Sequence, residues 1–219
     1  MPIALQHFRV RLALHCLREA EGPVLLLLHA LGEESPAAAP AECAAWPGSI
    51  YALDFSGHCA SMVPSGGGYT CEALMGDADA ALAHLGAVTL LARGLGAYVA
   101  VLLAGARPEL VRGAVLCDGQ GLAGGGTSVD SIVHTPTAQP LAARVDPRVL
   151  MELAVDPRPP QYAIAFAQQA AENSGLSRPF AVCCEERPEW LAAIVTGLGL
   201  KTAQVAESLA YYAREACSS

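Results

Sequence analysis

The sequence is poor in charged and aromatic residues, which make up 16% and 5% of its 219 residues, whereas 53% are hydrophobic. This balance excludes a disordered chain and favours a single domain over residues 1–219, because a chain of this length can bury a substantial core. Long apolar runs are also absent, since stretches such as 97–104 fall far below the roughly 20 residues of a membrane-spanning helix. Residues 1–6 lack the basic flank and cleavage site of a signal peptide, so we expect a cytoplasmic protein with no membrane partner.

Positive charge is scarce, with 13 basic against 21 acidic residues and a net charge of −8. The basic residues are scattered rather than striped, which argues against a nucleic-acid partner. The eight cysteines have no metal-finger spacing, so we expect mostly buried thiols in a reducing compartment, with no metal and no cofactor. The low polar fraction leaves apolar surface that a homo-oligomer would cover.

Short apolar runs predict the strands. Alternation of apolar and polar residues from Phe8 to Cys16 is typical of a half-buried strand at an antiparallel edge. The remaining runs are bounded by Gly, Pro or Asp, which suits strands buried on both faces; they span 23–28, 50–53, 88–91, 114–117 and 179–184.

Helical spacing alternates with these strands. Leu74, Ala78, Ala81 and Leu85 recur on one face, and Thr70 precedes them as a candidate cap. Further helices are predicted at 98–106, 162–172, 190–195 and 205–214, and Asp146 before Pro147 marks another helix start. The alternation predicts an α/β fold, with a mostly parallel sheet and helices on both faces. Residues 119–178 interrupt it, as a glycine-rich loop followed by a small helical cap.

Several motifs then occur in an order that resembles the α/β-hydrolase family. They are Leu25-Leu26-Leu27-Leu28-His29-Ala30, Ala52-Leu53-Asp54-Phe55-Ser56-Gly57-His58, Leu91-Ala92-Arg93-Gly94-Leu95-Gly96 and Arg107-Pro108-Glu109-Leu110-Val111. The resemblance implies an α/β-hydrolase-type sheet and a sharp strand-to-helix turn that carries small-x-Ser-x-small. Here Ala92 and Gly96 are the small flanks, but the nucleophile position is Gly94, which cannot form an acyl-enzyme.

The family's general base is also missing from its usual place. The last histidine is His134, within the predicted insertion, whereas the family's base follows the final strand. Removing the nucleophile alone costs a comparable enzyme about 10⁶ in turnover. The two losses together predict a pseudohydrolase that binds a small acyl-like ligand, or a protein partner, over Gly94. The resemblance of Gly96-Ala97-Tyr98 to the N-myc downstream-regulated family, which also places glycine at this turn, indicates that the scaffold is used without hydrolysis.

Backbone amides around the turn are the first candidate binding groups. The N–H of Leu95 and that of Ala30 or Leu31 are expected to converge as an oxyanion-type donor pair, to hold a carbonyl or carboxylate, or else to serve water or loop closure. Arg93 would add positive charge beside the turn, unless it points to solvent.

The remaining candidates are side chains. Asp118 ends a strand where the family can keep its acid. For His29 and His58, the alternatives are a structural hydrogen-bonding role and catalysis. His134 is a candidate to reach the pocket from the insertion.

Two rival hypotheses use other residues. Gly119 to Gly124 fit G-x-G-x-x-G after a strand, but residues 125–140 show no helical period to hold a pyrophosphate, which argues against dinucleotide binding. An ester or acyl hydrolase with a relocated nucleophile would use Cys59, Ser56 or Ser61, with His29 or His58 as its base.

Overall fold

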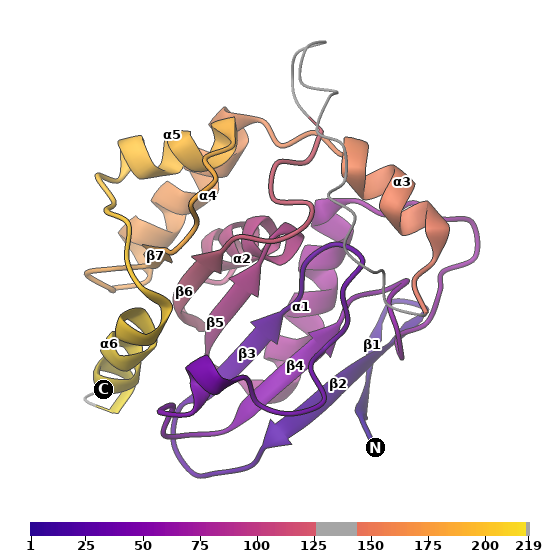
Figure 1. The fold of residues 1–219 in the computed structure, drawn as a ribbon, viewed down its shortest axis with the longest axis horizontal. Helices are drawn as coiled ribbons and strands as arrows, with labels where there is room; N and C mark the ends of the chain where they lie inside the picture. The colour runs from indigo at the N-terminus through magenta and orange to yellow at the C-terminus, as the bar shows by residue number, and fades with distance from the viewer. Residues whose placement is uncertain (126–143, 218–219) are drawn as a thin grey trace.

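The computed structural model describes residues 1–125 and 144–217, and Figure 1 shows how their helices and strands are arranged. Within these ranges seven strands form one sheet, in the order β1-β2-β4-β3-β5-β6-β7. The strands are β1 (Ile3–His7), β2 (Val10–Arg18), β3 (Val24–Leu28), β4 (Ile50–Asp54), β5 (Val88–Arg93), β6 (Val111–Cys117) and β7 (Phe180–Val182). β2 pairs antiparallel with β1 and β4, and all pairings from β4 to β7 are parallel. The predicted mostly parallel sheet with an antiparallel edge is confirmed.

The start of the first predicted strand is wrong. Phe8 lies in the turn between β1 and β2, with φ of 49° and 89% of its surface exposed. The strand expected from Phe8 is therefore a hairpin, in which β2 begins at Val10. Alternation of polar and apolar residues continues through such a tight turn, so the pattern alone does not reveal where the chain reverses.

The helices begin and end close to their predicted limits. In the part of the chain that the structure describes they are α1 (Cys71–Leu85), α2 (Leu95–Ala106), α3 (Pro147–Val155), α4 (Pro160–Asn173), α5 (Glu189–Gly197) and α6 (Val205–Cys217), together with the 3₁₀ turn η1 (Ala41–Cys43). Thr70 caps α1, since its Oγ1 accepts a hydrogen bond from the Ala73 N–H at 3.2 Å. Asp146 caps α3 by accepting from the Arg148 N–H at 3.1 Å. Both predicted caps are confirmed.

The two faces of the sheet carry separate apolar cores. Leu26, Leu28 and their counterparts on other strands form one core with buried residues of α1 to α5. Leu25 and Leu27 point to the opposite face, where the core is completed by α6 and by residues around η1. Helices therefore cover both faces, as predicted, but the second face is covered in large part by the helix-poor segment between β3 and β4 (Figure 1).

The predicted insertion 119–178 contains α3 and α4. The Tyr69 hydroxyl donates to the Asp146 carboxylate at 2.8 Å, and the Glu152 carboxylate accepts from the Gly68 and Tyr69 N–H groups at 2.7 Å each. These contacts hold α3 near the loop before α1, whereas α4 packs against α2 and α5. The extent of a cap stays a prediction, and His134 lies outside the described residues.

All eight cysteines are free thiols, of which Cys43, Cys71, Cys117 and Cys184 are buried and two more are half-buried. In the described ranges no cluster of His, Cys, Asp or Glu is arranged to hold a metal ion. Over the same residues, none of the helices has both the length and the apolar character that a membrane crossing demands.

Candidate functional site

A sharp turn joins β5 to α2 at Gly94. Its φ of 53° and ψ of −119° put the backbone in a region that residues with a side chain rarely adopt. Gly96 follows at a close approach, because a Cβ there would lie 2.7 Å from the carbonyl oxygens of Leu28 and His29. The small flank predicted at this position is thus required by packing. The structure keeps the strained turn and presents only backbone at its apex.

The amides that the sequence predicted to converge do so, and they hold a carbonyl oxygen of the chain itself. The N–H groups of Leu95 and Leu31 both donate to the Gln120 carbonyl oxygen, at 2.9 Å and 3.1 Å. Ala30, the other candidate, donates instead to the Glu33 carboxylate at 3.4 Å. Of the alternatives stated for the donor pair, loop closure is the one that accounts for both amides.

The same carbonyl also fills the space above Gly94. A Cβ on Gly94 would lie 2.2 Å from the Gln120 carbonyl oxygen and 2.6 Å from the carbonyl carbon of Gly119. We call residues Gly119–Leu122 the elbow plug. With the elbow plug in place, a serine at position 94 has no room for its side chain.

Buried side chains anchor the elbow plug from below. Arg158, only 3% exposed, donates through Nη1 to the carbonyl oxygens of Gly121 and, at 2.6 Å, Leu122. Trp190 donates its indole N–H to the Leu122 carbonyl at 2.8 Å. Gly121 has φ of +72°, and a Cβ there would lie 2.7 Å from the Leu31 Cβ. The glycines that mimic a dinucleotide-binding motif therefore serve close packing against the turn.

His29 and His58 are neutral structural residues with their hydrogen-bonding capacity used. The Nδ1–H of His29 donates to the Ala30 carbonyl at 2.8 Å, and its Nε2 accepts from the Phe55 N–H at 3.1 Å. The Nδ1–H of His58 donates to the Ser56 carbonyl at 3.3 Å, and its Nε2 accepts from the Gly32 N–H at 3.2 Å. Burial lowers the pKa of both rings; the pKa of His58 falls to about 3, with the neighbouring His29 adding to the effect. Neither ring has a free lone pair for a general base.

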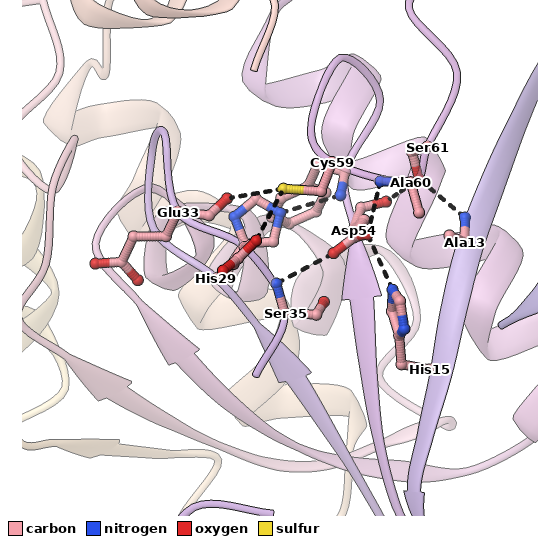
Figure 2. Close-up of polar contacts among 11 residues, drawn as sticks. Ala13, His15, His29, Glu33, Ser35, Asp54, Cys59, Ala60 and Ser61 are labelled. Atoms are coloured by element: carbon pink, nitrogen blue, oxygen red, sulfur yellow. Dashed lines mark hydrogen bonds and ion pairs between the residues drawn. The ribbon is translucent and has the colours of Figure 1, made fainter. Parts of the chain in front are cut away.

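The proposed substitute nucleophiles are held in other ways. The Ser61 hydroxyl donates to the Asp54 carbonyl at 2.5 Å and accepts from the Ala13 N–H at 2.9 Å (Figure 2). Burial and the carboxylates of Asp54 and Glu34 raise the pKa of the Cys59 thiol to about 12. Ser56 is buried. Across residues 1–125 and 144–217, none of the three side chains is hydrogen-bonded to an imidazole ring.

Asp118 orders a loop. Its carboxylate accepts from the N–H groups of Glu185 and Glu186 at 2.7 Å and 3.1 Å, which fixes the chain after β7. The sequence predicted a candidate acid at this strand end, but the hydrogen bonds of the Asp118 carboxylate are with backbone N–H groups.

Comparison with known proteins finds no matching family model and no matching curated protein. Among solved structures, the thioesterase domain from the curacin biosynthetic pathway superposes with a TM-score of 0.67 at 15% identity, over 100% of this chain and 99% of that one. A bacterial membrane phospholipase A superposes with a TM-score of 0.56 at 16% identity, over 100% of this chain and 87% of that one. The chain has the α/β-hydrolase fold. An epoxide hydrolase from Vigna radiata matches at 25% identity and a TM-score of 0.44, over 53% of this chain and 37% of the enzyme.

In this α/β-hydrolase fold, a cavity of about 240 Å³ lies beside the turn, on the sheet face that carries α6. Leu27, Ala52 and Leu91 contribute its apolar floor. Arg93 lines it with a half-exposed side chain, and its Nε lies 3.9 Å from the Glu33 carboxylate. The sequence therefore identified Arg93 and His29 as neighbours of one pocket, but that pocket lies beneath the β3–β4 segment rather than over Gly94.

A second cavity of about 300 Å³ contains a pair that sequence reasoning missed. His15 Nε2 lies 2.9 Å from the buried Asp54 carboxylate, which also accepts from the N–H groups of Ser35 and Ala60 (Figure 2). Burial by itself would raise the pKa of Asp54, but hydrogen bonds from the Ser35 and His15 side chains and from the Ala60 N–H together lower it. Cys59 and Arg144 line the same cavity. The only sequence signal was an aspartate directly after a buried strand, since the pairing of β2 with β4 joins distant segments.

Proposed function

We propose that this protein is a pseudohydrolase, a non-catalytic member of the α/β-hydrolase fold that binds a small molecule. The single observation that carries the proposal is the Gln120 carbonyl oxygen, which accepts from both the Leu31 and the Leu95 amide above a glycine apex. In hydrolases of this fold such amides stabilise a developing oxyanion, and loss of a single donor costs about 10²–10³ in kcat. Here both donors are engaged, and position 94 supplies no hydroxyl.

The anchoring of the elbow plug supports the proposal further. Arg158 and Trp190 are buried and donate to carbonyl oxygens of the elbow plug, so an opened plug would leave these donors without their partners. An unmet buried donor costs about 1–3 kcal/mol, and more when it is charged. The closed arrangement is therefore the stable one.

The alternative function, an ester or acyl hydrolase with a relocated nucleophile, has one observation in its favour. Cys59 and His15 line a common cavity, and Asp54 orients His15. Against it stands the raised pKa of the Cys59 thiol, because a catalytic cysteine needs a lowered one.

Activated esters separate these two functions. We expect the purified chain to give no saturable turnover of p-nitrophenyl acetate or butyrate, no fluorophosphonate labelling, and no change in background rate on Arg93→Ala. Saturable turnover that disappears in Cys59→Ala or Ser61→Ala would overturn the pseudohydrolase proposal and establish the alternative.

Gly94→Ser tests the space above the turn. We expect this variant to gain no esterase activity. It should also lose about 1–3 kcal/mol more stability than the same substitution at a control glycine, because the new side chain meets the Gln120 carbonyl. The control is Gly86→Ser, where φ is also positive at +77° and a Cβ meets nothing within 4 Å. Urea unfolding gives the comparison, and equal losses in the two variants would show that the elbow plug is not rigid.

A further inference from the structure

We infer that Cys117 and Cys183 form a modification site, a thiol pair that a hydroperoxide oxidises to an intramolecular disulfide. The inference goes beyond the binding role proposed above and does not depend on it. Three features of the described residues lead to it: the strand register that places the two cysteines side by side, the polar groups around one of the sulfurs, and the difference in exposure between the two thiols.

The two cysteines lie at the same level on neighbouring parallel strands. β6 and β7 pair with Leu116 opposite Val182, and the next residues along the two strands are Cys117 and Cys183. The pairing continues to that level, because the Cys183 N–H donates to the Leu116 carbonyl oxygen at 2.8 Å. Neighbouring strands lie about 4.8 Å apart, and a disulfide joins Cα atoms that are about 4.4–6.8 Å apart. The backbone spacing therefore suits a disulfide without movement of either strand.

Both side chains lie on the sheet face that carries α6, which packs against β6 (Figure 1). Cys117 belongs to the core on that face, and Cys183 packs against the same core. Cys184 belongs to the core on the opposite face, where its thiol donates to the Leu116 carbonyl oxygen at 3.3 Å. Side chains alternate between the faces along a strand, so Cys183 and not Cys184 is the partner of Cys117.

Polar groups around Cys183 favour its thiolate, the form that reacts with a peroxide. The Cys117 thiol donates a hydrogen bond to it, and the positive charge of Arg178 attracts it. The Ser208 hydroxyl lies 3.8 Å from the Cys183 sulfur and can turn toward it from the Gln204 carbonyl. Burial opposes these effects, but together they lower the pKa of Cys183 to about 7. The hydrogen bond between the thiols, and burial, raise the pKa of Cys117.

The two thiols also differ in exposure. Cys183 is half-buried, which leaves it within reach of a molecule as small as hydrogen peroxide, whereas Cys117 is only 6% exposed. A thiol that senses peroxide is accessible, has a low pKa and lies next to a second thiol that resolves the product. Cys183 is therefore the thiol that attacks the peroxide, and Cys117 is the one that resolves.

The oxidation takes place in two steps. The Cys183 thiolate attacks a peroxide oxygen, so that an S–O bond forms, the O–O bond breaks, and the departing hydroxide takes up a proton to leave as water. The Cys117 sulfur then attacks the Cys183 sulfur. The S–S bond forms, the S–O bond breaks, and the oxygen leaves with the Cys117 proton as a second water. The two sulfurs together lose two electrons, and the peroxide gains them.

Peptide mapping of the full chain tests the pair. The protein is treated with hydrogen peroxide, its remaining thiols are blocked with N-ethylmaleimide, and the digest is analysed by mass spectrometry without reductant. We expect one dominant linkage, between Cys117 and Cys183, which dithiothreitol reverses. A dominant linkage of Cys183 to Cys184 or to any other cysteine would contradict the inference, and so would oxidation confined to the exposed thiols of Cys16 and Cys217.

Single variants assign the two roles. Cys183→Ser should abolish the disulfide, and Cys117→Ser should leave a sulfenic acid at Cys183 that dimedone labels several-fold more than in the unmutated protein. The control Cys217→Ser removes an exposed thiol at the end of α6 and should leave the disulfide unchanged. Equal dimedone labelling of Cys183 with and without Cys117 would show that Cys117 does not resolve. Mapping of the unmutated chain decides the question even where a substitution at the buried position 117 prevents folding.

Discussion

Two serines show how far the role of a single hydroxyl depends on its partners. The Ser61 hydroxyl makes two hydrogen bonds and is buried, whereas the Ser35 hydroxyl interacts with the Asp54 carboxylate, whose pKa it helps to lower. Ser61→Ala should therefore cost about 1–3 kcal/mol, because it leaves the buried Ala13 N–H unmet. Ser35→Ala should cost less, about 0.5–1.5 kcal/mol, because the Asp54 carboxylate keeps its other hydrogen bonds. Urea unfolding of both variants checks this pair, and a larger cost for Ser35→Ala than for Ser61→Ala would contradict it.

At the same scale, residue types at the turn were predictable from sequence, but their contacts were not. The flanks Ala92 and Gly96 and the apex Gly94 follow a local pattern, because a sharp strand-to-helix turn requires small residues within a few positions. The Gln120 carbonyl oxygen accepts hydrogen bonds from the N–H of Leu95, which is 25 positions away in the sequence, and from that of Leu31, which is 89 positions away. No local periodicity encodes such a contact, so the sequence left open whether the amides hold a ligand or close a loop.

Among the secondary-structure elements, those with strong local signals were predicted well. The buried parallel strands are continuous apolar runs, and α1 has both helical spacing and the Thr70 cap. The β1–β2 hairpin and the His15–Asp54 pair were missed, because both depend on which strands pair and where the chain turns. Tertiary pairing of this kind adds information that a single strand's pattern lacks.

The packing of the elbow plug predicts how a substitution within it changes the stability of the protein. Gly121→Ala should destabilise the protein more than Gly68→Ala, by about 1–3 kcal/mol. Both positions have positive φ, at +72° and +86°, so both variants carry left-handed strain of about 1–2 kcal/mol. Only at Gly121 does the new Cβ also meet Leu31, at 2.7 Å, whereas at Gly68 it meets nothing within 4 Å. The midpoints of urea unfolding compare them, and equal losses would mean that the elbow plug moves aside freely.

On the scale of the whole molecule, the sheet divides two different tasks between its faces. Residues from five helices, α1 to α5, close one face over the larger core. The other face has α6 and the segment around η1, and it is on this face that the 240 Å³ cavity forms. The elbow plug covers the sharp turn at Gly94, and the 240 Å³ cavity lies instead beside the ends of the neighbouring strands. A binding role without hydrolysis is consistent with that division.

Three histidines give the whole protein a characteristic response to pH. His29 and His58 have lowered pKa values, so the stability that they provide is present above about 6.5 and is lost as pH falls below it; for His58 the loss continues toward its pKa of about 3. His7 has a raised pKa, first because of its hydrogen bond to Asp77, so its contribution is complete below about 6.5 and is lost as pH rises. With two rings against one, the protein should lose stability between pH 7 and pH 5.

His58→Gln isolates one of these contributions. The glutamine carbonyl oxygen is an acceptor for the Gly32 N–H in place of Nε2 but does not titrate, so the loss below pH 6.5 should become shallower by about 1.4 kcal/mol per pH unit. Urea unfolding at pH 7.5, 6.5 and 5.5 measures this slope. His84→Gln, on the exposed surface of α1, is the matched control and should leave the slope unchanged. If His58→Gln keeps the wild-type slope, the buried ring is not neutral in the folded protein, and the argument that its lone pair is unavailable to a substrate fails with it.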